Sequence, residues 1–312
     1  MIASGTQKME WTELPENVRG EVERVLCSAV VAAETQPGGF SPGVAARVRT
    51  RDGRAAFVKS VSSEVNEFAS AANRREISKT RALQGNPRVP RLLHAFESGP
   101  WTTLVYDLVV GKHPELPWKA KELDYVLSEI ESLSDSITPC PQPEVFRRLE
   151  EDQKEEFEGW ISFSRSGRVV ELNDDWVTKR LEKLVEFESA WPQASRGDSL
   201  VHTDLRADQI LLTSDKAVFV DWPHAAIAAP WIDFLFMFPS VELQGGPDMA
   251  TLVEISPLKR VRKDDLLPMA VALAGLFMWR CVQPPPPQLP TIRKFQRDQG
   301  DVVMRWLKTQ GL

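Results

Sequence analysis

The stretch that decides the fold is residues 200–212, which read LVHTDLRADQILL. Residues 218–222 follow shortly afterwards and read VFVDW. The two apolar runs, with turn residues between them, predict a β-hairpin that Asp204 precedes and Asp221 follows. Because a hairpin brings its two ends back together, we expect both carboxylates to face one cavity. There, one can accept a proton from an attacking hydroxyl while the other holds a metal ion.

The composition agrees with chemistry that runs on carboxylates. The 312 residues include 38 Lys+Arg and 44 Asp+Glu, for a net charge of −6, which argues against a dedicated nucleic-acid binder. The three cysteines are too few and too scattered for a disulfide framework or a zinc site, and the four histidines show no metal-ligand spacing. We therefore expect catalysis by Asp and Glu, together with a cation that prefers oxygen ligands.

The chain shows no targeting signal and no membrane span by pattern. Its first eight residues lack the basic start and the apolar stretch of a signal peptide. The longest apolar run, residues 266–279, is shorter than the roughly 18–20 residues that cross a bilayer, so it predicts a buried core helix. We expect a cytoplasmic protein.

The first third of the chain predicts a small lobe rich in β-structure. Residues 33–60 have the pattern of an antiparallel hairpin with a glycine-rich loop at 38–43 and a turn at Asp52-Gly53. A helix is predicted over 64–84, and further strands over 89–93 and 101–106.

From about residue 117 onward the periodicity is that of helices. Apolar residues recur at helical spacing over 123–133 and again over 176–190. The length fits one bilobal unit. We expect an α+β fold, with an N-terminal lobe over residues 1–108 and a helical lobe over 109–312.

In this order, the pieces resemble the aminoglycoside phosphotransferase and choline kinase group, which are small-molecule relatives of protein kinases. His202, Asp204 and Gln209, followed by Asp221, resemble the group's His-x-Asp-x-x-x-x-Asn motif and its metal-binding Asp. The remaining matches are GGFSPG at 38–43, AAFVK at 55–59, Glu76 seventeen residues after Lys59, LVYDL at 104–108 and PWID at 230–233. The resemblance covers about residues 33–240, and a later QPPPPQLP segment is similar to that of actinobacterial members.

The resemblance implies a bilobal protein-kinase-like fold, in which a small antiparallel β lobe carries one key helix. It also implies transfer of the γ-phosphoryl group of ATP or GTP, with Mg²⁺, to a hydroxyl of a small molecule such as an aminoglycoside or another antibiotic. The expected partners are a nucleotide and this hydroxylated acceptor, with neither nucleic acid nor membrane, and the expected state is a monomer or weak dimer.

The same resemblance assigns roles to individual residues. Asp204 accepts or orients the proton of the substrate hydroxyl, Asp221 binds Mg²⁺, and Gln209 stands where the group has its second metal-binding residue, Asn. Lys59 neutralises the α- and β-phosphates, and Glu76 orients Lys59 through an ion pair. The other expected participants are Arg206 on the γ-phosphate, His202 as a brace of the catalytic loop, and the nucleotide contacts Gly38, Gly39, Phe40, Ser41, Tyr106 and Leu108.

Each feature also has an ordinary structural interpretation. An Asp at a strand end is often a turn or cap residue, and the loop at 38–43 lacks the Gly-x-Gly-x-x-Gly pattern. Lys59 and Glu76 can each be solvated, and Arg206 can pair with Asp208. The acidic run at 144–158 can be a solvated helix or can line a cleft for a cationic substrate.

The alternatives extend to the function itself. Gln209 is one methylene longer than Asn, so an inactive or catalytically weak nucleotide-binding module stays open beside the enzyme. Transfer to a protein side chain is disfavoured, because the short segment between Asp221 and Asp233 leaves no room for a long activation segment. The acceptor is expected at residues 118–190, where four aromatic residues can either stack on a ring or pack in the core: Trp160, Phe163, Trp176 and Trp191.

Overall fold

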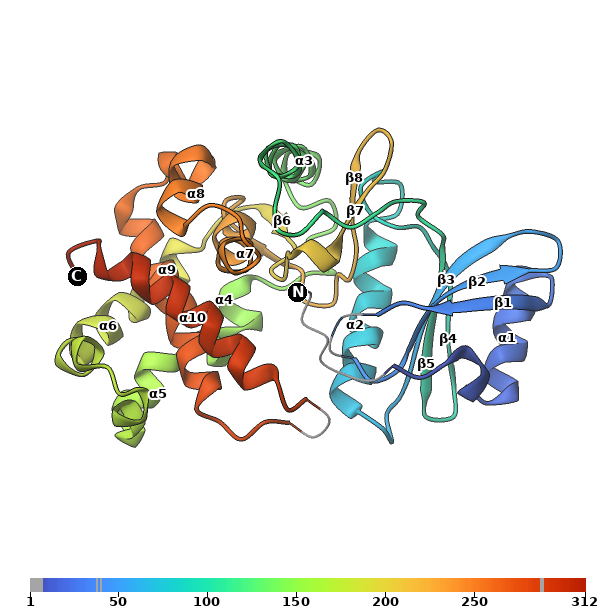
Figure 1. The fold of residues 1–312 in the computed structure, drawn as a ribbon, viewed down its shortest axis with the longest axis horizontal. Helices are drawn as coiled ribbons and strands as arrows, with labels where there is room; N and C mark the ends of the chain where they lie inside the picture. The colour runs from blue at the N-terminus through green and yellow to red at the C-terminus, as the bar shows by residue number, and fades with distance from the viewer. Residues whose placement is uncertain (1–7, 38, 40, 287–288) are drawn as a thin grey trace. The chain divides into compact units, whose positions relative to one another are not determined.

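The protein is described by a computed structural model that covers residues 8–37, 39, 41–286 and 289–312 (Figure 1). It divides into two compact units. The first comprises the described residues up to Pro114 together with Ala207–His224, and the second comprises Glu115–Arg206 together with Ala225–Leu312. The units are thus interleaved along the chain, whereas we expected a single boundary after residue 108. The division into a nucleotide-binding lobe up to residue 108 and a catalytic lobe after it stays a prediction.

A five-stranded antiparallel sheet forms the framework of the first unit, with strand order β1-β2-β3-β5-β4 (Figure 1). Its strands are β1 (Val30–Thr35), β2 (Val44–Thr50), β3 (Ala55–Ser62), β4 (Leu92–Ser98) and β5 (Trp101–Asp107). The Asp52-Gly53 turn joins β2 to β3, with Gly53 at a φ of 89° that suits glycine. The expected β-rich N-terminal part is confirmed.

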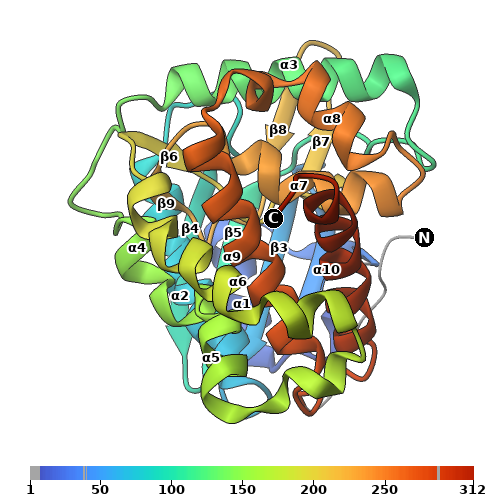
Figure 2. The same ribbon diagram turned by 90° about the vertical axis from the view of Figure 1, so that its left-hand side faces the viewer.

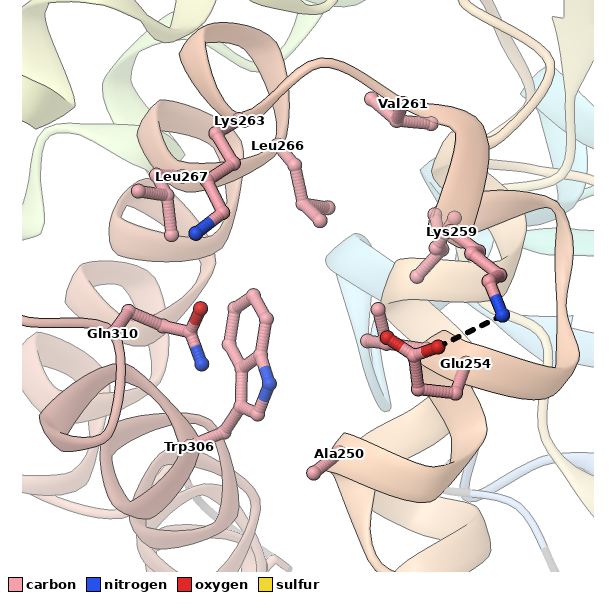
Figure 3. A pocket seen from close by; sticks show the side chains of 11 residues that line it. Ala250, Glu254, Lys259, Val261, Lys263, Leu266, Leu267, Trp306 and Gln310 are labelled. Carbon is pink, nitrogen blue, oxygen red and sulfur yellow. Dashed lines mark ion pairs between the residues drawn. The ribbon is translucent and has the colours of Figure 1, made fainter.

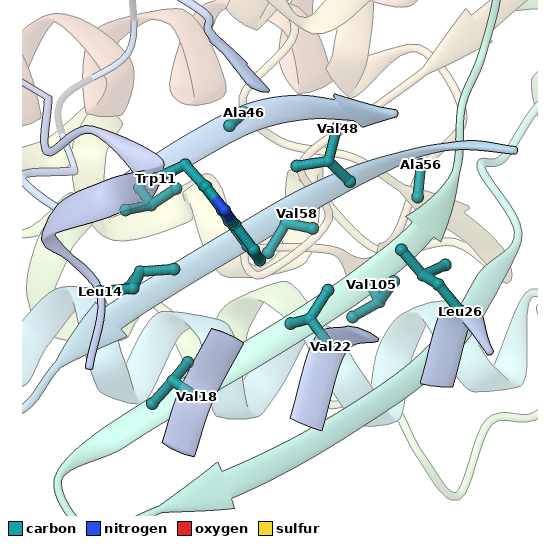
Figure 4. Packing of buried hydrophobic residues seen from close by; sticks show 11 residues of the cluster. Trp11, Leu14, Val18, Val22, Leu26, Ala46, Val48, Ala56, Val58 and Val105 are labelled. Carbon is teal, nitrogen blue, oxygen red and sulfur yellow. The ribbon is translucent and has the colours of Figure 1, made fainter. Parts of the chain in front are cut away.

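Helix α1 (Glu16–Leu26) packs its apolar side on this sheet. Val18, Val22 and Leu26 recur every fourth residue, so they share one face of the helix. Figure 4 shows this face against side chains of the sheet, with Trp11 of the short helix η1 (Trp11–Glu13) beside them. The sheet residues of this core are Val44, Ala46, Val48, Ala56, Val58 and Val105.

Helix α2 (Glu67–Ala82) packs on β3 and β5 of the same sheet. Asn66 begins this helix, because its side chain accepts a hydrogen bond from the Ala69 N–H at 2.9 Å. The helix therefore starts where the sequence predicted it to within a few residues. It carries Glu76 towards the strand that bears Lys59.

The predicted hairpin consists of β7 (Ile210–Leu212) and β8 (Ala217–Phe219), which pair antiparallel. It belongs to the first unit, because its main chain is bonded to that unit at both strands. Lys112 and Leu212 exchange two backbone hydrogen bonds of 3.0 and 2.7 Å, and the Phe219 N–H donates to the Arg88 carbonyl at 2.8 Å.

The second unit is mainly helical, with one two-stranded ribbon of β6 (Ser199–Val201) and β9 (Ala226–Ala228) (Figure 2). Helix α9 (Lys263–Cys281) packs against α5, α6 and α10 and is the expected buried core helix. The remaining helices are α3 (Ala120–Ser136), α4 (Leu149–Asp152), η2 (Lys154–Phe157), α5 (Gly159–Ser166), η3 (Arg168–Leu172), α6 (Asp175–Ala194), α7 (Ile232–Leu243), α8 (Met249–Ile255), η5 (Pro257–Arg260) and α10 (Ile292–Lys308). Within the part of the chain that the structure describes, no helix has the length and apolar character of a membrane span.

Candidate active site

In the first unit, Lys59 lies between two carboxylates. Strand β3 supplies Lys59, helix α2 supplies Glu76, and Asp221 follows strand β8. The Lys59 Nζ is 2.5 Å from Glu76 Oε2 and 2.6 Å from Asp221 Oδ1. The structure thus joins three of the predicted site residues, two of which are 162 positions apart in the chain.

Burial and charge act in opposite directions on this cluster. Burial lowers the pKa of Lys59, but Asp221 and Glu76 outweigh it and raise that pKa above its ordinary value. Burial also raises the pKa of Glu76, which is 2% exposed, although Lys59 and a hydrogen bond from Tyr106 oppose the rise. Since Lys59 stays protonated, the first unit holds a fixed positive charge next to the partly exposed Asp221 carboxylate.

The two predicted hinge residues lie at the end of β5. The Tyr106 hydroxyl donates a hydrogen bond of 2.9 Å to Glu76 Oε1, so this buried side chain supports the ion pair. Burial, followed by the charge of Glu76, raises the pKa of Tyr106 well above its ordinary value. Leu108 is half-buried just after the strand. Nucleotide contact by either residue stays a prediction.

Gln209 and Asp221 lie together at the open end of the hairpin. Gln209 ends the short helix η4 (Ala207–Gln209), and its carbonyl accepts the Val220 N–H at 2.9 Å. Its side-chain Nε2 donates a hydrogen bond of 3.3 Å to Asp221 Oδ2. Asp221 adopts a left-handed backbone conformation with φ of 71°, which is uncommon for a non-glycine residue and typical of functional loops.

These two residues fit a magnesium ion. Both offer hard oxygen donors, and Mg²⁺ commonly binds one or two protein side chains, several waters and the phosphates of a substrate. Among the residues described, no group of three or more His, Cys, Asp and Glu side chains is placed to hold a metal. Metal binding by Gln209 and Asp221 stays a prediction. In it, the phosphates of the nucleotide would supply the remaining ligands of the metal.

The glycine-rich loop is described only in part. Gly38 and Phe40 lie outside the described residues, whereas Gly39 has a φ of 68° and Ser41 is half-buried. The Ser41 carbonyl accepts a hydrogen bond of 2.6 Å from the Lys8 ammonium, a contact that the sequence did not predict. Gly43 is required by close packing, because a Cβ there would lie 2.1 Å from the Ser60 carbonyl oxygen.

In the second unit, Asp233 holds the loop that carries Asp204. Asp233 lies in the first turn of α7, and its two oxygens accept hydrogen bonds of 2.9 and 2.8 Å from the N–H groups of His202 and Thr203. Burial raises the pKa of Asp233 to about 6, although these two hydrogen bonds act to lower it. Thr203 has a φ of 68°, so the chain turns sharply just before Asp204.

His202 is fully buried within this loop. Its Nδ1 is 3.3 Å from the Asp204 N–H, and its own N–H donates to Asp233. The position agrees with the bracing role that we expected for this histidine. The role of Asp233 in holding the loop was missed as a site function, although the PWID segment at 230–233 had marked the residue.

Arg206 forms an ion pair with Asp204, two residues before it. The pair belongs to the second unit, whereas Asp208, the other partner considered for Arg206, belongs to the first. The Arg206 side chain is 13% exposed and that of Asp204 37% exposed, so the carboxylate is the more accessible member. Contact of Arg206 with a γ-phosphate stays a prediction, as does a cavity shared by Asp204 and Asp221.

The aromatic residues proposed for an acceptor site are mostly core residues. Trp160, Phe163 and Trp191 are buried, and only Trp176 of the four is partly exposed, with the guanidinium of Arg180 4.8 Å from its ring centroid. Trp160, Phe163 and Trp191 therefore pack in the core and are not available to stack on the ring of an acceptor.

Three of the seven acidic residues in the run at 144–158 form ion pairs within the second unit. Glu150 pairs with Arg196 at 3.2 Å and Asp152 pairs with Arg147 at 3.7 Å. A further pair joins Glu156 to Arg280. These contacts favour the structural interpretation of the run over a surface reserved for a cationic substrate.

A pocket in the second unit lies among α8, η5, α9 and α10 (Figure 3). Trp306 and Gln310 face an ion pair of Glu254 with Lys259 across it. The predicted site residues are all absent from its lining. We attach no chemistry to this pocket.

The fold that carries these residues is the protein-kinase-like fold of aminoglycoside phosphotransferases and related small-molecule kinases. No protein-family model matches the sequence. No curated protein matches it either. The resemblance noted in the sequence is confirmed at the level of the fold, while the actinobacterial type stays a prediction.

Three solved structures illustrate the similarity. Spectinomycin phosphotransferase, in complex with ADP and spectinomycin, has a TM-score of 0.57 and 10% identity over 94% of this chain and 98% of its own. An amicoumacin kinase, in complex with AMP-PNP, Ca²⁺ and Ami, has a TM-score of 0.51 and 11% identity over 93% and 94%. A streptomycin–ATP ternary complex of an aminoglycoside phosphotransferase has a TM-score of 0.50 and 12% identity over 93% and 99%. At such identities the comparison establishes the fold alone.

Proposed function

We propose that the protein is a kinase that transfers the γ-phosphoryl group of ATP or GTP to a hydroxyl group of a small molecule. The observation that carries this proposal is the Lys59 ammonium held between Glu76 and Asp221. A cation fixed in this way is suited to phosphate oxygens, and a neighbouring carboxylate is suited to a divalent metal. The fold shared with kinases that were solved with nucleotides supports the same conclusion.

The reaction needs positioning and charge stabilisation more than covalent chemistry. Asp204 orients the acceptor hydroxyl and takes its proton as the oxygen forms a bond to the γ-phosphorus. The bond from that phosphorus to the β-phosphate oxygen breaks, and the nucleoside diphosphate leaves. Lys59 neutralises phosphate charge throughout, and Asp221 with Gln209 would hold Mg²⁺. When bound, this ion supplies further neutralisation of the phosphate oxygens.

For the acceptor, we propose an aminoglycoside or another antibiotic that carries hydroxyl groups. The fold neighbours that act on spectinomycin and amicoumacin support this class. A net charge of −6 also suits cationic acceptors through long-range attraction. We further propose a cytoplasmic protein that is a monomer or a weak dimer and binds neither nucleic acid nor membrane.

A nucleotide-consumption assay tests the proposal. The full chain is incubated with ATP or GTP, with or without Mg²⁺, and a panel of hydroxylated antibiotics and metabolites, and the diphosphate and phosphorylated acceptor are measured. We expect turnover to require Mg²⁺ and to collapse in Asp204→Ala and in Asp221→Ala. Wild-type rates in both variants would mean that the proposed site is wrong. A thermal-shift panel with a non-hydrolysable ATP analogue narrows the acceptor class first, since a ligand of the folded state raises Tm.

A second candidate function is a nucleotide-binding module with weak or no catalysis. Gln209 favours it, because its side-chain amide faces Asp221 at 3.3 Å where the group has the shorter Asn. The Gln209→Asn variant distinguishes the two. Unchanged or lower turnover would show that Gln209 is a competent metal ligand, whereas a large gain would show that the natural protein is impaired or tuned.

A further inference from the structure

The segment before helix α1 is anchored on the first unit's sheet. Trp11 is 6% exposed and Leu14 2% exposed, and both belong to the core between α1 and the sheet (Figure 4). Met9 packs against the same core, and the Glu10 carboxylate accepts a hydrogen bond of 2.6 Å from the Thr35 hydroxyl of β1. These contacts fix the direction in which the chain runs at Lys8.

The Lys8 side chain lies against the glycine-rich loop. Its ammonium donates a hydrogen bond of 2.6 Å to the Ser41 carbonyl oxygen. A Cβ built on Gly39 would lie 3.6 Å from the same Nζ, so Lys8 is close to the loop at both Gly39 and Ser41. The Lys8–Ser41 hydrogen bond therefore ties the N-terminal segment to this loop, which lacks the Gly-x-Gly-x-x-Gly pattern.

The charge of Lys8 belongs to the same electrostatic cluster as the candidate active site. Burial is the largest cause that lowers the pKa of Lys8 to about 8, and Lys59 lowers it further, while Asp221 and Asp208 raise it. All of these residues are in the first unit. An ammonium has three donors, and the Ser41 carbonyl uses one of them. A polyanion that interacts with both Lys8 and Lys59 would relieve the repulsion between these two cations.

We propose that Lys8 is a further nucleotide-binding residue, which contacts the terminal phosphates of the nucleotide as a second cation beside Lys59. This inference rests on the proposed function and adds to it a residue from outside the motif region. Lys8, which belongs to the N-terminal segment, would then contact both the glycine-rich loop at Ser41 and the nucleotide. It discriminates nucleotides by their number of phosphates, because the terminal phosphates carry the charge that it meets.

The test is a set of binding titrations on the full chain with ATP, ADP and AMP in the presence of Mg²⁺. We expect Lys8→Met to weaken ATP binding by about tenfold or more, the usual effect of losing a hydrogen bond to a charged group. AMP binding should change by less than about twofold, and Lys8→Arg should regain most of the ATP affinity. Lys121→Met, on the exposed side of α3, is the matched control and should bind ATP as the wild type does.

Each contrary result is distinct. Equal effects on ATP and AMP would overturn the inference, because they would indicate a general disturbance of the unit, which thermal unfolding of the variant would reveal. Tighter ATP binding by Lys8→Met would also overturn it, since Lys8 would then block the phosphate position. A wild-type chain that binds no nucleotide would overturn the proposed function itself, whereas unchanged ATP affinity in Lys8→Met would overturn only the role of Lys8.

Discussion

The two units both bury carboxylates but give them different partners. Glu76 in the first unit contacts a cation and a phenol, namely Lys59 and Tyr106. Asp233 in the second unit accepts main-chain N–H groups of the loop that carries Asp204. Glu188 of α6, also in the second unit, accepts the N–H groups of Trp160 and Ile161 at 3.0 and 2.8 Å.

The difference shows two uses of a buried carboxyl group. Paired with a lysine, the carboxylate fixes the position of a cation that is available to a ligand. Paired with main-chain donors, it sets the shape of a loop or the start of a helix. The first arrangement serves binding directly, and the second serves it through backbone geometry. Variants of the lysine-paired cluster should therefore lose mainly activity, whereas variants of the carboxyl groups bonded to the main chain should lose mainly stability.

The largest effect is expected at the cation. Lys59→Met removes the fixed charge between Glu76 and Asp221, and turnover should fall by about 10²-fold or more, as when one preorganised electrostatic contact is lost. Rates of diphosphate release measure it. Lys216→Met, on the hairpin turn between β7 and β8, is the control and should retain normal turnover. Turnover above half of the wild-type value in Lys59→Met would remove Lys59 from the mechanism.

The next effect is expected at the loop. Asp233→Ala leaves one buried and one partly buried N–H group without an acceptor and should lower the free energy of unfolding by about 2–5 kcal/mol. Urea unfolding measures the loss. Asp233→Asn keeps one acceptor oxygen and should lose less, while Asp124→Ala, exposed on α3, should change stability by less than about 0.5 kcal/mol. Equal stability of Asp233→Ala and the wild type would show that the loop keeps its shape by other contacts.

The third effect is a dependence of the free energy of unfolding on pH, which we expect from Glu188. Burial raises its pKa to about 8, although the N–H groups of Trp160 and Ile161 act to lower it. The folded state thus keeps a proton that the unfolded state has released above its ordinary pKa of about 4.5, so stability falls as pH rises towards 8.

The measurement is the free energy of unfolding between roughly pH 6.5 and 8, where we expect a fall of up to about 2 kcal/mol from this group. Glu188→Gln should flatten that fall. Glu186→Gln, exposed on the same helix, should leave the wild-type slope intact. A slope that is the same in Glu188→Gln as in the wild type would assign the pH dependence to other groups.

The smallest effect is expected at the phenol. Tyr106→Phe removes one hydrogen bond to Glu76 and keeps the aromatic packing, so the free energy of unfolding should fall by about 1–2 kcal/mol. Nucleotide affinity should change little, since Lys59 keeps its ion pair. A loss of nucleotide affinity of about tenfold or more in Tyr106→Phe would instead show that the Tyr106 hydroxyl itself serves nucleotide binding.

The parts of the site that follow from the sequence are those with a rule, which the order of motifs in the resembling kinase group supplies. The resemblance implies that Lys59 pairs with Glu76 and that Gln209 and Asp221 serve one metal site, and the structure brings the residues of each pair together. Strand β4 was expected at 89–93 but spans Leu92–Ser98. Pro90 explains the shift, because proline has no N–H to donate to a strand ladder.

Other contacts have no such rule. The Lys8–Ser41 hydrogen bond joins residues 33 positions apart, and neither residue belongs to a periodic pattern that would bring them together. Arg206 pairs with Asp204 two residues before it, whereas the sequence had suggested Asp208 two residues after it, because residue type alone does not choose between two carboxylates at equal spacing. Two arginine partners of the acidic run, Arg196 and Arg280, come from separate segments and had no sequence signal.

The interleaving of the two units has a consequence for how the protein can be divided. The chain passes from one unit to the other after Pro114, Arg206 and His224. A fragment that ends at Pro114 would keep Lys59 and Glu76 but lack Asp221, so its lysine would lose one of its two counter-charges. Domain exchange with a related kinase would therefore need two grafted segments in register, and circular permutation would need to spare all three crossings.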